Sequence, residues 1–318
     1  MRALSSEVLQ IFAEMITLFV IVAAGYAGKR LGMMNEDFDA RLSKVILNLS
    51  LPGMIIGSVL TAEQLPSLQD ILLTLLFSCL SFAVVIAIAL AVTFAMRISV
   101  GHRGVFRFML CFGNVGFIGF PVLSAIYGPD SLIYATIFNL PFNFLVFTVG
   151  AWFLTQDNAS DGSKIDVSWR LFISPVIISC LVAIVLALCG VHGIPVVGAA
   201  FNSLGSLTTP AALLIIGSSL ANLPAGELIG GFRLWMASLF RLIIIPLVVW
   251  GIFHFFLENP LLLGVIVVIS GMPVATNGTM LCYQYGGNSH DMAQGTFVTT
   301  IASLVSIPLL VMFLSAVA

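Results

Sequence analysis

The chain has 318 residues, of which 60% are hydrophobic and only 8% are charged, and its mean hydropathy is +1.14. Charged residues make up about a quarter of an average soluble domain, so this composition excludes a water-soluble globular protein and indicates lipid as the solvent. The formal net charge of −2 and the lack of a long basic run argue against a nucleic-acid partner.

The apolar stretches predict an all-α membrane protein, because a helix needs about 20 apolar residues to cross the hydrocarbon. Ten spans are expected, at 8–28, 38–60, 70–95, 105–127, 131–155, 168–190, 196–220, 232–255, 260–285 and 290–316. The first is expected to be a retained span and not a signal peptide, because Lys29 and Arg30 follow it at once. The connections are short, which leaves no room for a soluble domain.

Lysine and arginine occur in and beside the loops that follow spans 1, 3, 5 and 7, and are absent from the loops that follow spans 2, 4, 6 and 8. These residues are Lys29, Arg30, Arg41, Lys44, Arg97, Arg103, Arg107, Lys164, Arg170 and Arg233. Basic loops stay in the cytoplasm. A multi-pass protein of the cytoplasmic membrane with both termini outside is therefore expected.

The two halves of the chain resemble each other. Pro52 and Pro210 stand 158 positions apart, each shortly before an IIGS string, and Gly128 and Gly286 are separated by the same 158 positions. An odd number of spans per repeat inverts the second copy, which is the architecture of many secondary transporters. The alternative is that such strings recur by chance in membrane helices.

Spans 4 and 9 both carry helix-breaking residues near their centres. The strings are GNVGFIGFP over 113–121 and GMPVATNGT over 271–279. Paired breaks at corresponding repeat positions indicate a transporter binding site. Half-helices that start at Pro121 and Pro273 would point free N–H groups and positive dipole ends at the bilayer centre, which suits an anion.

The candidate binding residues lie in these two strings, and their polar members bind a carboxylate as neutral donors, without a fixed cation. They are Asn114, Gly116, Pro121, Pro273, Thr276, Asn277 and Thr279. The alternative is that the prolines are ordinary kinks and the asparagines join helices. Asn48, Asn139 and Asn143 are interpreted as such interhelical hydrogen-bonding residues and not as ligands.

Two charged residues are accessory candidates. Arg241 lies several residues inside span 8, where it either snorkels to the cytoplasmic face or stands near the anion path. Asp70 and Glu14 lie near outer span ends, and no carboxylate accompanies either break, which disfavours a cation substrate. The five cysteines form no CxxC pair and the four histidines do not cluster, so no metal or cofactor is expected.

Several strings together resemble the auxin efflux carrier (PIN-like) family over nearly the whole length. They are GYAGKRLGMM after span 1, GNVGFIGFPVLSAIYG in span 4, TTPAALLIIGSSLANL in span 7 and MPVATNGTMLCYQYG in span 9. Arg241 followed by Pro246 adds a basic-then-proline pattern in span 8. The strings of spans 4 and 9 are the most specific.

The resemblance implies the ten-helix fold of sodium/proton antiporters and bile-acid symporters, with helices 4 and 9 broken at proline and crossing each other. It implies a scaffold from 8–60 and 168–220 and a transport domain from 70–155 and 232–316. Elevator-type movement, a homodimer and an organic-anion substrate, such as malate, malonate or an auxin-like weak acid, are implied as well.

The family's crossover prolines map to Pro121 and Pro273 and its crossover asparagines to Asn114 and Asn277. Plant members carry an acidic and a basic residue early in span 3; Asp70 matches the acid, but Thr74 stands one turn later.

Two other functions compete with an organic-anion carrier. A sodium-coupled symporter of the bile-acid type would use carbonyl groups freed by the breaks. A non-transporting receptor or a membrane enzyme is disfavoured, because the sequence has no HExxH motif and no membrane-embedded catalytic aspartate pair.

Overall fold

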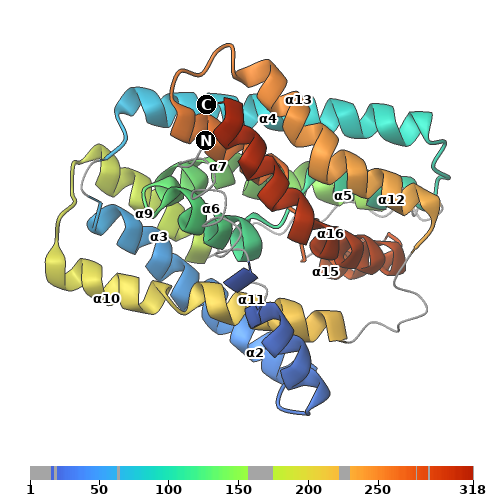
Figure 1. Ribbon diagram of the computed structural model, residues 1–318, viewed down its shortest axis with the longest axis horizontal. Helices are drawn as coiled ribbons and strands as arrows, with labels where there is room; N and C mark the ends of the chain where they lie inside the picture. The colour runs from blue at the N-terminus through green and yellow to red at the C-terminus, as the bar shows by residue number, and fades with distance from the viewer. Residues whose placement is uncertain are drawn as a thin grey trace.

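The computed structural model describes residues 16–17, 20–62, 65–156, 175–221, 230–276, 278–285 and 287–317 (Figure 1). Within these ranges the chain forms helices and turns, and the one β-type contact is an isolated antiparallel bridge between Gly113 and Val274. The all-α prediction is therefore confirmed for the described residues.

The helices of the first half follow a helical segment over 20–30. They are α2 (Glu36–Val45), α3 (Leu51–Leu60), α4 (Leu68–Ala95), α5 (Arg103–Cys111), α6 (Phe120–Tyr127), α7 (Ser131–Leu145) and α8 (Ala151–Thr155). Single π-helical turns join α2 to α3 (Ile46–Ser50), lead into α6 (Val115–Gly119) and join α7 to α8 (Val146–Gly150).

The helices of the second half begin again after residue 174. They are α9 (Pro175–Leu188), α10 (Pro195–Gly205), α11 (Thr208–Ala221), α12 (Phe232–Leu239), α13 (Ile245–Phe253), α14 (Pro260–Ser270), α15 (Gly278–Tyr285) and α16 (Ser289–Val317). A π-helical turn (Phe240–Ile244) joins α12 to α13.

Helix lies within every expected span. Among the described residues, five continuous helices are long and apolar enough to cross a membrane by length and composition. They are Asp37–Leu60, Leu68–Ala95, Ser131–Thr155, Phe232–Phe253 and Ser289–Val317. The segments Val115–Tyr127, Pro175–Leu188 and Pro260–Ser270 are shorter apolar helices. The chain is thus a multi-pass membrane protein by the composition of its helices.

Helix α4 shows how the sequence sets one spanning element. It begins with a capping box, in which Ser67 accepts a hydrogen bond from the Asp70 backbone N–H and the Asp70 carboxylate accepts one from the Ser67 backbone N–H. Leucines at every fourth position, from Leu68 to Leu80, are exposed along one face. A solvent-exposed leucine stripe is unfavourable in water and matches acyl chains. The opposite face is buried, and there Ser78 donates to the Phe138 carbonyl of α7 at 2.9 Å.

The helices form two groups (Figure 1). Helices α2, α3, α10 and α11 lie together at one side, whereas α4, α12, α13 and α16 lie at the other, with α6 and α7 between them. Helix α3 packs against α9 and α10, and α4 packs against α5, α7 and α14. The break in span 4 lies where the two groups meet, because the π-helical turn Val115–Gly119 contacts α11 of the first group and α14, which packs against α4 and α16 of the second.

A hydrogen bond in the first group joins equivalent positions of the two halves. The hydroxyls of Ser50 and Thr208 lie 2.7 Å apart, both side chains are buried, and each residue stands two positions before Pro52 or Pro210. Their separation in sequence, 158 residues, equals the offset of the repeat. Two equivalent residues that touch each other lie where a twofold axis relating the halves would pass.

The first group also depends on close backbone contact. A Cβ atom added at Gly217 of α11 would lie 1.9 Å from the Val22 carbonyl oxygen and 2.7 Å from the Tyr26 nitrogen. Glycine lets these two backbones approach, as small residues do at many membrane-helix interfaces.

We therefore expect Gly217→Ala to force the segment 20–30 away from α11. The expected loss is about 1–3 kcal/mol, seen as a drop of several degrees in the thermal unfolding midpoint of the detergent-purified protein. Gly251→Ala is the matched control, because nothing lies within 4 Å of a Cβ atom added at Gly251 of α13. Equal midpoints for the two variants would contradict the assigned contact.

Candidate functional site

The first break lies between α5 and α6. Helix α5 ends at Cys111, Phe112 is extended, and the helix resumes at Val115. Asn114 stands at the N-terminal cap, and its side-chain oxygen accepts a hydrogen bond from the Phe117 backbone N–H at 3.1 Å. The asparagine side chain thus satisfies a donor that the broken helix would otherwise leave free.

The second break lies between α14 and α15. Helix α14 ends at Ser270, and helix resumes at Gly278 in α15. Between them the Val274 backbone N–H donates to the Thr299 hydroxyl of α16 at 3.0 Å. The freed backbone is again paired inside the protein, which a chain in lipid requires.

The two breaks cross and bind each other through their backbones. The Asn114 N–H donates to the Pro273 carbonyl at 2.7 Å, and the Ala275 N–H donates to the Phe112 carbonyl at 3.1 Å. These bonds flank the antiparallel bridge between Gly113 and Val274. Segments about 160 residues apart therefore form one structural unit.

The prediction that the half-helices start at the two prolines is wrong. The first resumes at Val115, and Pro121 is the second residue of α6, already inside the half-helix. Pro273 lies in the extended break, five residues before α15, where its carbonyl accepts the bond from Asn114. The side chain of Asn114 caps the first half-helix and so sets where it starts. Pro273 lies in the second break, where it has no N–H that needs a partner and its carbonyl accepts a hydrogen bond.

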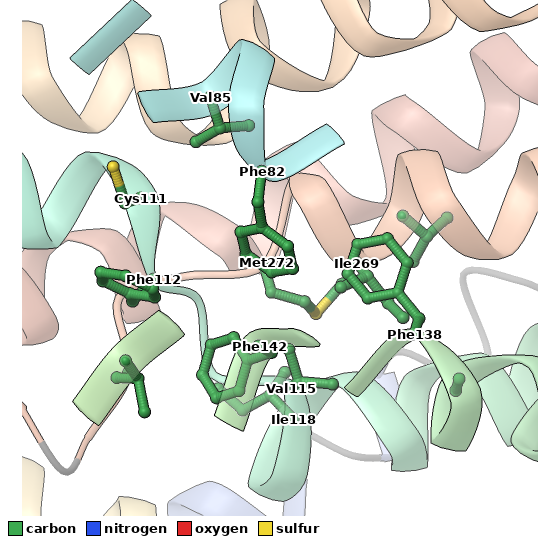
Figure 2. Close-up of a cluster of buried hydrophobic side chains, with 14 of the residues drawn as sticks. Phe82, Val85, Cys111, Phe112, Val115, Ile118, Phe138, Phe142, Ile269 and Met272 are labelled. Carbon is green, nitrogen blue, oxygen red and sulfur yellow. The ribbon is translucent and has the colours of Figure 1, made fainter. Parts of the chain in front are cut away.

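Aromatic and sulfur side chains pack one side of the crossing (Figure 2). Phe82 of α4 and Phe138 and Phe142 of α7 gather around Met272 of the second break, next to Phe112 of the first. The ring centroids of Phe82 and Phe138 lie 5.4 Å apart, and those of Phe112 and Phe142 lie 5.9 Å apart. This cluster packs the crossing against α4 and α7 with apolar side chains.

Arg241 donates hydrogen bonds to backbone carbonyls of both broken helices. Its side chain is 2% exposed, and its guanidinium donates to the carbonyls of Met272 at 2.9 Å, Leu110 at 2.9 Å and Cys111 at 3.3 Å. Leu110 and Cys111 belong to the last turn of α5, whose carbonyls lack helical donors and carry the negative end of the dipole. The arginine charge is thus balanced by helix ends from both breaks.

The expectation that Arg241 snorkels is therefore wrong, because the residue is buried. It lies at the crossing, next to the cavity-lining residue Gly113, although it does not itself line the cavity. A Cβ atom added at Gly113 would lie 2.0 Å from its Nη2 atom, so glycine at that position makes room for the guanidinium.

A cavity of about 330 Å³ lies beside the crossing. Its polar lining residues are Lys44, Asn48, Asn114, Asn139, Asn143 and Thr276. Its apolar wall includes Phe117, Phe142 and Phe147. The volume is near the lower end of the range for small-molecule sites, about 300–1,000 Å³. An apolar wall with a few convergent polar groups is typical of such sites.

The predicted site residues divide into three sets. Asn114, Gly116 and Thr276 line the cavity. Pro121 and Pro273 are buried beside it and do not line it. Asn277 and the side chain of Thr279 lie outside the described residues.

Asp70 is not among the residues that line the cavity. It belongs to the capping box of α4, and its carboxylate lies 3.5 Å from the Asn259 amide nitrogen at the start of α14. Its described contacts cap and join helices.

Sequence reasoning missed four polar residues of the cavity. Lys44 was interpreted only as a topology signal, and Asn48, Asn139 and Asn143 only as residues that join helices, yet all four line the cavity. The lining thus includes a cation, Lys44, which the expectation of a site without a fixed cation did not contain. A usable signal was present, because Lys44 and Asn48, like Asn139 and Asn143, stand four positions apart and share one helix face.

A family model described as membrane transport protein matches residues 10–311. The chain belongs to that family, the auxin efflux carrier (PIN-like) family. The resemblance of the span 4 and span 9 strings is thereby confirmed.

Relatives in this family are similar to the chain over almost their full lengths. The "Uncharacterized transporter" of Methanothermobacter thermautotrophicus is 25% identical over 302 residues, which cover 92% of this chain and 95% of that protein. The "Uncharacterized transporter MJ1031" of Methanocaldococcus jannaschii is 25% identical over 92% of this chain and 96% of its own. The "Uncharacterized transporter YfdV" of Escherichia coli K12 is 23% identical over 93% and 95%.

The contact between Arg241 and the crossing yields a double-mutant prediction. Arg241→Met removes the donor to three carbonyls and is expected to cost about 3 kcal/mol. Gly113→Ala is expected to displace the guanidinium and weaken the same contact. Thermal unfolding midpoints of both single variants and the double variant measure the coupling. The double variant should lose less than the sum of the single losses; strict additivity would show that the residues act independently.

Proposed function

We propose that the protein is a secondary transporter that holds a small organic anion in the cavity beside the crossing. The observation that carries this proposal is the composition of the cavity lining. Among the described residues that form it, Lys44 is the one charged residue, and none is a carboxylate. Lys44 forms no ion pair with any residue that the structure describes. An unbalanced ammonium at a cavity attracts an anion.

The half-helix that starts at Asn114 adds to this attraction. The continuous segment Val115–Tyr127 points its N-terminal end at the crossing, so its partial positive charge adds to that of Lys44. Asn114 is 4% exposed, and its amide nitrogen has no hydrogen-bond partner among the described residues. Asn114 is also one of the residues that line the cavity, and a buried amide without a protein partner supports a role for this residue in binding a polar ligand.

The proposed architecture has ten spans in two inverted five-helix repeats. Helix within each expected span, the paired breaks and the contact between Ser50 and Thr208 at the repeat offset support it. Inverted repeats of this kind place substrate at the interface of the halves, near the bilayer midplane.

We propose a scaffold from 8–60 and 168–220 and a transport domain from 70–155 and 232–316, which move against each other as an elevator. The cavity is lined from both parts, with Lys44 in the first and Asn114 in the second. A homodimer through the scaffold and a location in the cytoplasmic membrane with both termini outside complete the proposal.

The conformation is proposed to be open to the cytoplasm. Beyond the crossing, the cavity is lined by Lys44, Phe147 and Pro175. These residues belong to the ends of spans 2, 5 and 6 that the basic loops assign to the cytoplasmic side.

The sodium-coupled alternative is less favoured because the carbonyl groups at the two breaks already accept hydrogen bonds from the protein. Sodium at the crossing would need several oxygen ligands from the breaks. The carbonyls of Leu110, Cys111 and Met272 already accept bonds from Arg241, and those of Phe112 and Pro273 accept backbone bonds. A fixed cation at those oxygens also repels a second one.

Sodium independence is accordingly expected. Uptake of a radiolabelled carboxylate into proteoliposomes should stay within about twofold when external sodium is replaced by potassium at constant membrane potential. A fall of tenfold or more on sodium removal would favour the bile-acid type of symporter.

Substitutions at the cavity test the anion site itself. Asn114→Ala and Lys44→Met should each lower carboxylate uptake by about tenfold, since each removes one charged or charge-assisted contact worth about 1–2 kcal/mol. Arg41→Met is the matched control, because Arg41 lies one turn earlier on α2, is 77% exposed and pairs with Asp37. Size-exclusion profiles verify that each variant is folded. Normal uptake by both cavity variants would defeat the site assignment.

A further inference from the structure

A second cavity, of about 500 Å³, lies among the ends of four helices and shares no lining residue with the cavity beside the crossing. Its walls come from the end of α6, the end of α13 and the turn after it, the start of α14 and the end of α16. The loops that follow spans 4 and 8 adjoin it and contain no lysine or arginine, so the proposed topology places its mouth at the outer face of the membrane. We call this cavity the outer pocket.

The outer pocket carries a negative charge. Glu258 is the one carboxylate among the described residues that line it, and none of them is a lysine or an arginine. Glu258 is exposed and forms no ion pair with any residue that the structure describes. A carboxylate at a cavity without a counter-charge attracts a cation.

His254 adds a hydrogen-bond acceptor to the outer pocket. Its Nδ1 atom lies 3.0 Å from the Trp250 carbonyl oxygen, and because a carbonyl can only accept, Nδ1 carries the proton. In the neutral tautomer that this bond selects, Nε2 is an acceptor. The imidazole is held in place by stacking on the Trp250 indole, with ring centroids 4.4 Å apart and planes inclined by 7°.

The phenol of Tyr127 lies at the wall of the same pocket. A Cβ atom added at Gly264 would lie 2.5 Å from the Tyr127 hydroxyl oxygen, and both residues line the pocket. Glu258, His254 and Tyr127 therefore bring three acceptors to one cavity. A primary ammonium group donates three hydrogen bonds and carries the charge that Glu258 lacks, whereas a trimethylammonium group has no N–H to donate.

The surroundings of the outer pocket are those of a lipid headgroup. Phe255 and Phe256, in the turn between His254 and Glu258, are 75% and 70% exposed. Two adjacent exposed phenylalanines are unfavourable in water and are suited to the membrane interface. The leucines of the pocket wall continue this apolar surface inward; they are Leu257, Leu261, Leu263 and Leu314.

We infer that the outer pocket binds a phospholipid with a primary ammonium headgroup, a phosphatidylethanolamine of the outer leaflet. The ammonium donates to Glu258, His254 and Tyr127, and the acyl chains follow the leucines and the exposed phenylalanines. The phosphate stays at the mouth in water, because no lysine or arginine lines the pocket. An exposed ion pair alone contributes little, so selectivity depends on the three acceptors acting together. This site is separate from the anion site, and either assignment can fail without the other.

Three lipids with the same acyl chains test the headgroup. Thermal unfolding midpoints of the detergent-purified full chain are measured with dioleoyl phosphatidylethanolamine, phosphatidylcholine or phosphatidylglycerol at equal mole fraction in the micelles. We expect phosphatidylethanolamine to raise the midpoint by about 3–5 °C more than either of the others. An equal rise with phosphatidylcholine, which differs by three methyl groups on the nitrogen, or with anionic phosphatidylglycerol would overturn the inference.

Glu258→Gln places the effect at the outer pocket. The midpoint without lipid should stay within about 1 °C, because Glu258 is exposed, and the extra rise with phosphatidylethanolamine should fall to about a third or less. Asp130→Asn is the matched control, since Asp130 is an exposed carboxylate in the loop after span 4 and does not line the pocket. A full rise in Glu258→Gln, or an equal loss in Asp130→Asn, would contradict the assigned site.

Free ethanolamine separates a lipid from a soluble amine. At millimolar concentration and without added phospholipid it should shift the midpoint by less than about 1 °C, because it lacks the acyl chains that the apolar wall holds. A shift as large as that with the lipid, lost in Glu258→Gln, would overturn the assignment to a phospholipid.

Discussion

The crossing of two broken helices is the contact on which the rest of the structure depends. In lipid, each peptide group released from a helix must find a partner inside the protein. Here the two breaks supply partners to each other, through the Asn114–Pro273 and Ala275–Phe112 backbone bonds. Arg241 supplies the donors that the helix ends lack. The crossing is stabilised because each break pairs backbone groups that the other break leaves free.

This mutual pairing divides the polar groups between two tasks. Arg241 and the carbonyls of Leu110, Cys111 and Met272 bond one another and hold the two breaks together. Asn114, Asn139 and Lys44 line the cavity, and the two asparagines each keep one buried polar atom without a partner among the described residues. The aromatic cluster around Met272 packs against the crossing, and its member Phe142 also forms part of the cavity wall (Figure 2). A charged residue deep in the fold is therefore not by itself evidence of a ligand site, because Arg241 serves the backbone and the less buried Lys44 faces the cavity.

Much of the fold could be predicted from the sequence because hydropathy and glycine or proline placement act locally. Apolar length located the helices, and the strings around Asn114 and Pro273 located the breaks. The start of the first half-helix could not be derived from proline alone. The side chain of Asn114 caps the helix, which therefore begins at Val115, six residues before Pro121. The cavity was only half predicted. Lys44 of α2 and Asn139 of α7 both line it. Their proximity depends on how the helices pack, and the residue pattern of a single span does not contain that information.

The location of Lys44 has an electrical consequence. It belongs to α2, in the helix group that contains α3, α10 and α11, whereas Asn114 belongs to the crossing (Figure 1). If the crossing carries the anion through the membrane while α2 stays in place, the cargo leaves its counter-charge behind. Each carboxylate then travels as an uncompensated charge, and a potential of 100 mV does work of about 2.3 kcal/mol on it. Membrane voltage alone would then favour export of the anion from a cell whose interior is negative.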